Sequence, residues 1–129
     1  MIRSLRRAVL LTGAIAALTV PAASSEARTK TVLEPSGTVR VGLGDALVIQ
    51  YRVSGGVGID WRLHYDSSPN VLRLLAVTER AENPDPRAIG GYSRKAYRFR
   101  ARRRGTAYLT YVRDFRGDES RTYVRVRIR

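Results

Sequence analysis

Apolar and polar residues alternate along most of this chain after residue 38, and this alternation limits the folds available to it. The stretch 46–53 reads ALVIQYRV and places every second residue, from Leu47 to Val53, on one side of an extended strand. The stretch 122–129 reads TYVRVRIR and repeats the pattern, with arginines on the other side. Since a helix needs a period near 3.6 and no stretch shows it convincingly, the chain is predicted to be all-β, with one solvated face on each sheet.

Turn signals separate the alternating stretches at regular intervals, which is typical of an antiparallel β-sandwich of about seven strands. The predicted strands cover 38–41, 46–53, 59–65, 71–77, 95–102, 106–112 and 122–129. Residues 78–91, TERAENPDPRAIGG, and 113–120, RDFRGDES, are predicted to be loops. The shared phase of the strands predicts one core between two sheets that contains Leu47, Ile49, Tyr51, Trp61, Leu109 and Tyr111.

The first 27 residues show the order of charge, apolar run and small residues that is typical of a secretory signal. Positive residues precede the uncharged run 8–20, AVLLTGAIAALTV, which is shorter than the roughly 20 residues of a membrane-spanning helix. We therefore predict a signal peptide over 1–27, cleaved after Ala27, and one β-sandwich domain over 28–129. That domain would be secreted or periplasmic and would not span a membrane. Cleavage after Ser24 and an uncleaved N-terminal anchor are the alternatives.

Residues for common catalytic and metal chemistry are scarce. The chain has no cysteine and one histidine, His64, so it can build neither a Cys–His pair nor a cluster of histidine ligands. The glycines of SGGVG at 54–58 do not form a phosphate-binding fingerprint, because a strand rather than a helix follows them. The acidic residues within 78–91 offer only a weak case for calcium. We therefore expect no catalytic residues, no metal and no cofactor.

The chain is strongly basic, with 24 Lys and Arg against 11 Asp and Glu and a formal net charge of +13. All of these basic residues except Lys30 and Lys95 are arginine. Several of the arginines fall on the outward side of predicted strands, where guanidinium groups suit phosphates and sulfates. An anionic surface is therefore an expected partner, and a simple solvated strand face is the alternative. No nucleic-acid recognition motif is present, and we expect a monomer that does not bind nucleic acid.

Three stretches together resemble the chagasin-type inhibitors of papain-like cysteine peptidases. VGLGDALVIQYRVSGGVGIDW at 41–61 is similar to the family's strand, glycine-ending loop and tryptophan, with Gly58 and Trp61 at the matching distances. AIGG at 88–91 resembles the family's glycine-rich second loop. GTAYLTYVRDF at 105–115 resembles its third motif, with Thr110, Tyr111 and Arg113 as direct matches.

This resemblance implies an immunoglobulin-like sandwich whose three loops lie side by side and enter the active-site cleft of a papain-like cysteine peptidase. The alternative is a non-inhibitory binding module of the same fold for an anionic glycan or envelope surface. The first loop has Ser54 to Val57 where the family has Asn-Pro-Thr-Thr, and the third has Asp114 and Phe115 where it has proline and tryptophan. The implied peptidase-binding residues are Ser54, Gly55, Gly56, Val57, Gly58, Ile89, Gly90, Gly91, Tyr92, Arg113, Asp114 and Phe115.

Overall fold

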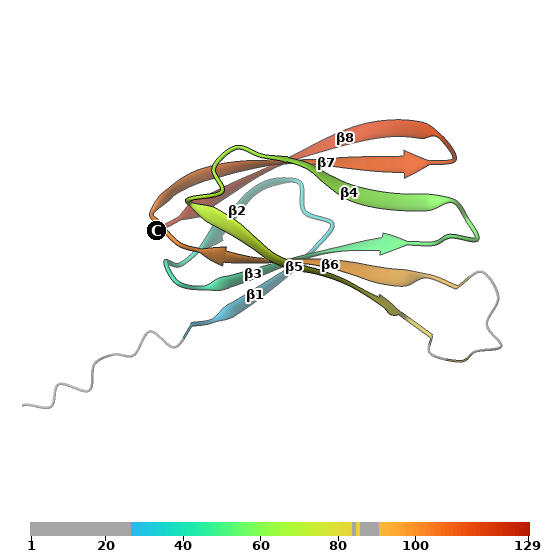
Figure 1. The fold of residues 1–129 in the computed structure, drawn as a ribbon, viewed down its shortest axis with the longest axis horizontal. Coiled ribbons are helices and arrows are strands. Elements are labelled where there is room, and N and C mark those ends of the chain that lie inside the picture. The colour runs from blue at the N-terminus through green and yellow to red at the C-terminus, as the bar shows by residue number, and fades with distance from the viewer. Residues whose placement is uncertain (1–26, 84, 86–90) are drawn as a thin grey trace, which may run out of the picture.

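The computed structural model describes residues 27–83, 85 and 91–129, and every regular element in that part of the chain is a strand. Two four-stranded sheets lie face to face as a sandwich (Figure 1): sheet A, in the order β1-β3-β6-β5, and sheet B, in the order β2-β8-β7-β4. The strands are β1 (Thr29–Leu33), β2 (Gly37–Val41), β3 (Ala46–Val53), β4 (Ile59–Asp66), β5 (Leu72–Ala81), β6 (Ser93–Ala101), β7 (Gly105–Phe115) and β8 (Asp118–Ile128).

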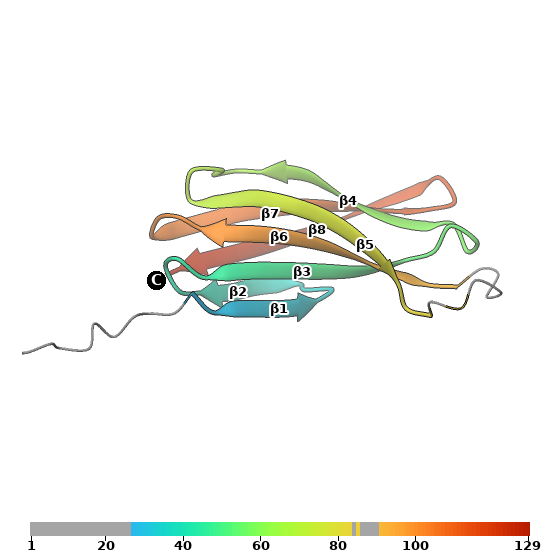
Figure 2. The same ribbon diagram turned by 60° about the horizontal axis from the view of Figure 1, so that its bottom comes forward.

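The predicted immunoglobulin-like β-sandwich is confirmed, with one strand that the sequence did not reveal. That strand, β1, was missed because Val32 alone of its residues is partly buried and packs against the core, so no alternation marks it. The central pairs are antiparallel, whereas β1 runs parallel to β3 and β2 runs parallel to β8 at the two sheet edges. Figure 2 shows the strands of sheet A side by side. The linker between β1 and β2 crosses from one sheet to the other over the buried Pro35.

The hydrophobic core lies between the sheets and is built from the inward residues of both. All six residues that the shared phase assigned to one core belong to one buried cluster, so this prediction is confirmed. Leu47, Ile49 and Tyr51 of β3 are completely buried, as are Leu109 and Tyr111 of β7. Because full burial of a large apolar side chain stabilises a fold by about 1.5–3 kcal/mol, this cluster holds together a domain that has no cysteine.

Both long loops predicted from the sequence are shorter in the structure. Residues 78–81 continue β5 as an edge strand, and β7 and β8 extend to Phe115 and from Asp118, leaving a turn of two residues. These strand ends project beyond the core, so both of their faces meet solvent and the alternation disappears. The polar sequence of these strand ends therefore resembles that of a loop.

The predicted signal peptide and its alternatives concern residues 1–26, which lie outside the described part of the structure. Within the described residues, no helix has the length and apolar character needed to cross a membrane. The signal peptide and the cleavage after Ala27 stay predictions.

Candidate functional site

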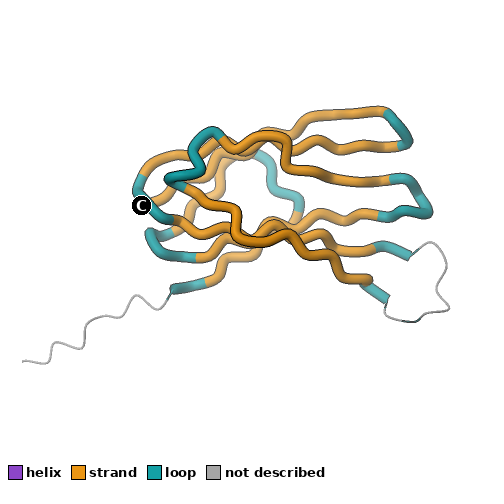
Figure 3. The backbone as a smooth tube through the Cα atoms, in the orientation of Figure 1, coloured by secondary structure: helices purple, strands orange, loops and turns teal. Residues whose placement is uncertain are grey.

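Three connections between strands lie at one end of the sandwich (Figures 1 and 3). The first is the turn between β3 and β4, and the third is the turn between β7 and β8. The second joins β5 to β6, and the structure describes its two flanks, up to Asn83 and from Gly91. Antiparallel pairing of β5 with β6 and of β7 with β8 brings these connections to the same end. The first and third stretches singled out in the sequence therefore meet in space with the described flanks of the second.

The first connection is a hydrogen-bonded turn centred on Ser54. The Ser54 carbonyl accepts from the N–H groups of Gly58 and Ile59, at 2.8 and 3.0 Å. Its hydroxyl accepts from the Val57 N–H at 3.2 Å. Gly58 has a φ of +83°, in the left-handed region that favours glycine. Although the stretch contains three glycines, these bonds fix the path of its backbone.

Ser54 also joins the first connection to the second. Its side-chain oxygen donates to the carbonyl of Gly91 at 3.2 Å, 37 residues further along the chain. Ser54 is 2% exposed, and its hydroxyl is engaged in positioning the two connections. Its role in contacting a peptidase stays a prediction.

The flanks of the second connection are held by a small ionic cluster. The Arg52 guanidinium donates to both carboxylate oxygens of Glu82, at 2.9 and 3.0 Å, and lies 3.9 Å from the centre of the Tyr92 ring. Arg94 donates to the same carboxylate at 3.4 Å. The hydrogen bond from Arg52 is the largest of the causes that hold the pKa of Glu82 below its usual range. Two further predicted contact residues, Ile89 and Gly90, lie outside the described residues.

The third connection is a turn formed by Arg116 and Gly117. Both have positive φ, at 52° and 91°, as the two central residues of a type I′ hairpin turn do. The Asp114 carboxylate accepts from the Gly117 N–H at 2.8 Å, so this predicted contact residue stabilises the turn. The ring of Phe115 is 37% exposed and has the guanidinium groups of Arg113 and Arg116 near it, 5.7 and 5.5 Å from its centre.

Arg116 joins the third connection to the first, and the sequence gave no reason to single it out. Its backbone N–H donates to the Gly58 carbonyl at 3.0 Å, and its Nε donates to the Val57 carbonyl at 3.2 Å. A side chain on Gly58 would place its Cβ 2.9 Å from the Arg116 Cγ. The close approach of the two turns therefore requires glycine at this position.

An aromatic cluster supports these connections from inside the sandwich. Tyr51 stacks on Trp61 with ring centres 4.3 Å apart, and Tyr97 and Tyr111 pack around Tyr51. The Trp61 carbonyl, on sheet B, accepts from the Tyr97 hydroxyl at 2.9 Å and from the Lys95 ammonium at 2.7 Å, both on sheet A. Burial raises the pKa of Tyr51 and of Tyr111 well above the usual range. These phenols therefore stay neutral, and the cluster ties the two sheets together near the end that carries the connections.

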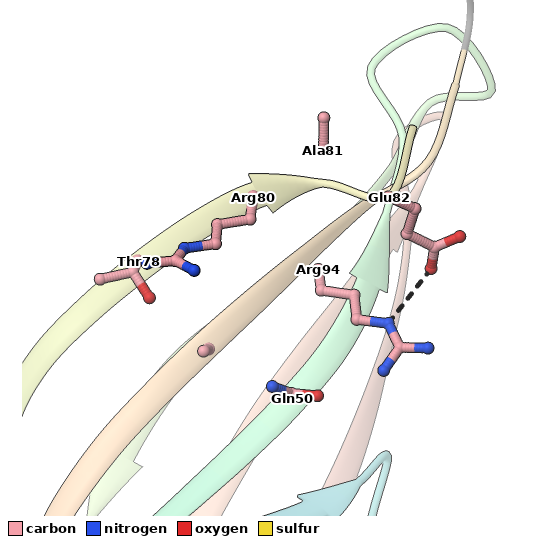
Figure 4. A pocket seen from close by; sticks show the side chains of 7 residues that line it. Gln50, Thr78, Arg80, Ala81, Glu82 and Arg94 are labelled. Carbon is pink, nitrogen blue, oxygen red and sulfur yellow. Dashed lines mark hydrogen bonds and ion pairs between the residues drawn. The ribbon is translucent and has the colours of Figure 1, made fainter. Parts of the chain in front are cut away.

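The hollows of this structure hold no catalytic arrangement among the residues described. One of about 490 Å³ lies on the outer face of sheet A (Figure 4), where the ion pair of Arg94 and Glu82 borders Thr78, Arg80 and Gln50. His64 is exposed on β4 and is not among the residues that line this hollow. In the described part of the chain, no three His, Cys, Asp or Glu residues gather closely enough to hold a metal ion. By contrast, the first and third connections are hydrogen-bonded turns at one end of the sandwich.

Comparison with solved structures finds a similar fold in other proteins. The cysteine protease inhibitor EhICP2 from Entamoeba histolytica is similar with a TM-score of 0.64 and 20% identity, over 81% of this chain and 98% of that one. The solution structure of amebosin gives 0.61 and 13%, over 79% and 98%. PbICP-C, solved in complex with falcipain-2, gives 0.51 and 15%, over 80% and 91%.

These similarities cover almost the whole of the other proteins, so the described domain has their complete fold. No protein-family profile matches the chain, and no curated protein matches it. At identities of 13–20%, the likeness is one of fold.

Proposed function

We propose that this protein inhibits papain-like cysteine peptidases by inserting its three connections into the active-site cleft. The observation that carries the proposal is the set of hydrogen bonds from Ser54 to Gly91 and from Arg116 to Val57 and Gly58, which holds the connections together as one wedge. The same fold occurs in a cysteine protease inhibitor and in an inhibitor solved with falcipain-2. The chain acts as an inhibitor and not as an enzyme.

The wedge has the features that an extended cleft requires. Gly55 and Gly91 are exposed, and the space next to the Cα of each is open, so their backbone can approach a partner closely. Phe115 and Val57 supply apolar surface, and Arg113 supplies a charged fork beside it. Since the turns are ordered before binding, little conformational entropy is lost when the complex forms.

The direct test is a titration of papain with the purified domain, followed by the steady-state hydrolysis of a fluorogenic peptide. We expect reversible inhibition that weakens as substrate rises, and an inhibitor band that stays intact on a denaturing gel. Phe115→Ala should weaken inhibition, while Tyr123→Ala, an exposed aromatic on the outer face of β8, serves as the matched control. Absence of inhibition at any concentration of the folded domain would refute the proposal.

Two further features belong to this proposal. The predicted signal peptide would bring the inhibitor to peptidases in the periplasm or outside the cell, where it would act as a monomer with one enzyme per wedge. The outward arginines favour an anionic surface as a second partner, because several of them lack an acidic neighbour in the described part of the chain. Such a partner could be held while the wedge remains free.

A further inference from the structure

The outer face of sheet B carries three exposed tyrosines. Tyr65 on β4, Tyr108 on β7 and Tyr123 on β8 are 57%, 51% and 66% exposed. Tyr65 and Tyr123 both pair with Thr110, one from each side, and Thr110 is only 9% exposed between them. Tyr108 lies one row away on the same face, since Leu109 and Tyr111 point into the core. Three aromatic rings therefore share one flat surface.

Arginines surround these rings on the same face. Arg125 pairs with Tyr108 and has its guanidinium 5.5 Å from the centre of that ring. Arg127 occupies the next outward position of β8 on one side of Arg125, and Arg121 lies beyond Tyr123 on the other side. On this face of the described structure, the one arginine in an ion pair is Arg62, which binds Glu119 at 2.8 Å. The remaining guanidinium groups are available to an anionic ligand.

A hollow of about 500 Å³ lies where the tyrosines meet β2. Its lining residues are Tyr108 of β7, Tyr123, Val124 and Arg125 of β8, and Gly37 and Thr38 of β2. The face therefore presents three kinds of group together: aromatic rings, hydroxyl groups and guanidinium groups. An acidic sugar matches all three, because its ring presents C–H groups and hydroxyls and also carries a carboxylate or sulfate.

Charge alone does not single out this face, because the outer face of sheet A is also basic. There Arg98 and Arg100 pair with Val48 and Ala46 on β3, and with Ala76 and Arg73 on β5. No tyrosine stands among these pairs, so the part of that face around Arg98 and Arg100 offers charge without rings. We propose that the outer face of sheet B binds an acidic polysaccharide, with Tyr108 and Tyr123 stacking on sugar rings and Arg121 and Arg125 holding carboxylate or sulfate groups.

The tyrosines of this glycan face lie away from the wedge, whereas Arg121 is nearer to it, three residues from Asp118 at the start of β8. Tyr108 is seven residues from Phe115 along β7, which corresponds to about 23 Å at a strand rise of about 3.3 Å per residue. A polysaccharide lying across Tyr108 and Tyr123 would leave the three connections exposed. The inhibitor could thus be retained on an acidic glycan while its wedge still reaches a peptidase.

The test measures binding of the full chain to a heparin oligosaccharide and to polygalacturonate, with neutral dextran as the blank, at about physiological salt. Tyr108→Ala/Tyr123→Ala keeps the charge and should bind about tenfold more weakly, whereas Tyr108→Phe/Tyr123→Phe should bind nearly as well as the unmodified chain. Arg121→Ala/Arg125→Ala should lose at least about tenfold, and the matched pair Arg98→Ala/Arg100→Ala on sheet A should lose about threefold or less.

Two outcomes would overturn the proposal. The first is an equal loss for both arginine pairs with no effect of the tyrosine variants, which would mean attraction by net charge only. The second is tighter binding to single-stranded oligothymidylate than to either glycan, which would assign the face to nucleic acid. Urea midpoints of every variant check folding. Because the readout contains no peptidase, its result is independent of whether the protein inhibits one.

Discussion

At the scale of single residues, two of the three glycines of the first turn, Gly55 and Gly58, have different roles. Gly58 has a φ of +83° and faces the Arg116 side chain, whereas Gly55 lacks a positive φ and has open space where a Cβ would be. Gly58→Ala should therefore lower the free energy of unfolding by about 1–2 kcal/mol and weaken inhibition. Gly55→Ala should raise that free energy by about 0.4–1 kcal/mol. Urea unfolding of both variants makes the comparison, and equal midpoints would contradict this assignment.

Phe115 is the single side chain that we expect to contribute most to peptidase binding. It is partly exposed between two guanidinium groups at the tip of the wedge, and aromatic residues at such positions often dominate interfaces. Phe115→Ala should weaken inhibition by at least about 2 kcal/mol, which is roughly thirtyfold. Val57→Ala should cost less than half of that. Inhibition constants against one papain-like peptidase decide the ranking, and equal losses would show it to be wrong.

At the scale of elements, the hydrogen bonds between the turns are expected to affect peptidase inhibition, and Ser54→Ala tests this. Ser54→Ala removes both the bond to the Gly91 carbonyl and the bond from the Val57 N–H, while leaving the exposed surface of the wedge unchanged. We expect weaker inhibition, with a loss of stability of about 1 kcal/mol. Amide hydrogen exchange should increase at Val57. Unchanged exchange together with unchanged inhibition would show that the tie does not order the wedge.

The ionic cluster beside the second connection predicts how inhibition depends on pH. Its hydrogen bond from Arg52 lowers the pKa of Glu82 below the ordinary value of 4.5. A lowered pKa in the folded state means that the contribution of this carboxylate is present above 4.5 and is lost only as the pH falls through the lower folded value. Inhibition should therefore stay constant from neutral pH to about 4.5 and decline below it.

Glu82→Gln provides the control for this pH dependence. The variant lacks the titrating carboxyl group, so the loss of inhibition that protonation of Glu82 causes at low pH should be absent from it. An NMR titration of the Glu82 carboxyl carbon measures the pKa directly. A value at or above 4.5 would contradict the geometry, which has two guanidinium groups within 3.4 Å of that carboxylate.

The sequence predicted the elements well wherever one face of a strand is buried. β3 and the end of β8 alternate strictly because the core removes every second side chain from water, and their phase identified Leu47 to Tyr51 correctly. The same reasoning failed for residues 78–81 and 113–120, where both faces of a projecting strand meet solvent. The bonds of Ser54 and Arg116 join positions 37 and 59 residues apart, and no local pattern encodes them.

At the scale of the whole molecule, the sandwich separates two surfaces that would otherwise compete. The turns at the end of the strands are narrow and ordered, and the outer face of sheet B is broad, aromatic and basic. Because both are fixed to the same rigid pair of sheets, a ligand on the face need not disturb the wedge. The sequence showed the basic residues but not the surface, since Tyr65, Tyr108 and Tyr123 come together only through strand order.

Trp61 joins the core to the wedge, so its removal should affect the whole molecule. It is 9% exposed, stacks on Tyr51, and its carbonyl accepts hydrogen bonds from Lys95 and Tyr97 across the two sheets. Trp61→Ala should cost about 3–5 kcal/mol, because it leaves a cavity beside buried rings. Trp61→Phe keeps most of the volume and should cost less than half as much.

Urea unfolding of both Trp61 variants measures the change in the free energy of unfolding. The inhibition constant of the fraction that remains folded shows whether the wedge still binds the peptidase. The backbone carbonyl of residue 61 is retained in each variant, so any loss of inhibition comes from altered packing beneath the first turn. We expect Trp61→Ala to weaken inhibition in proportion to its loss of stability and Trp61→Phe to retain most of it. A destabilised Trp61→Ala that still inhibits fully would show that the bonds of Ser54 and Arg116 order the wedge without support from the core.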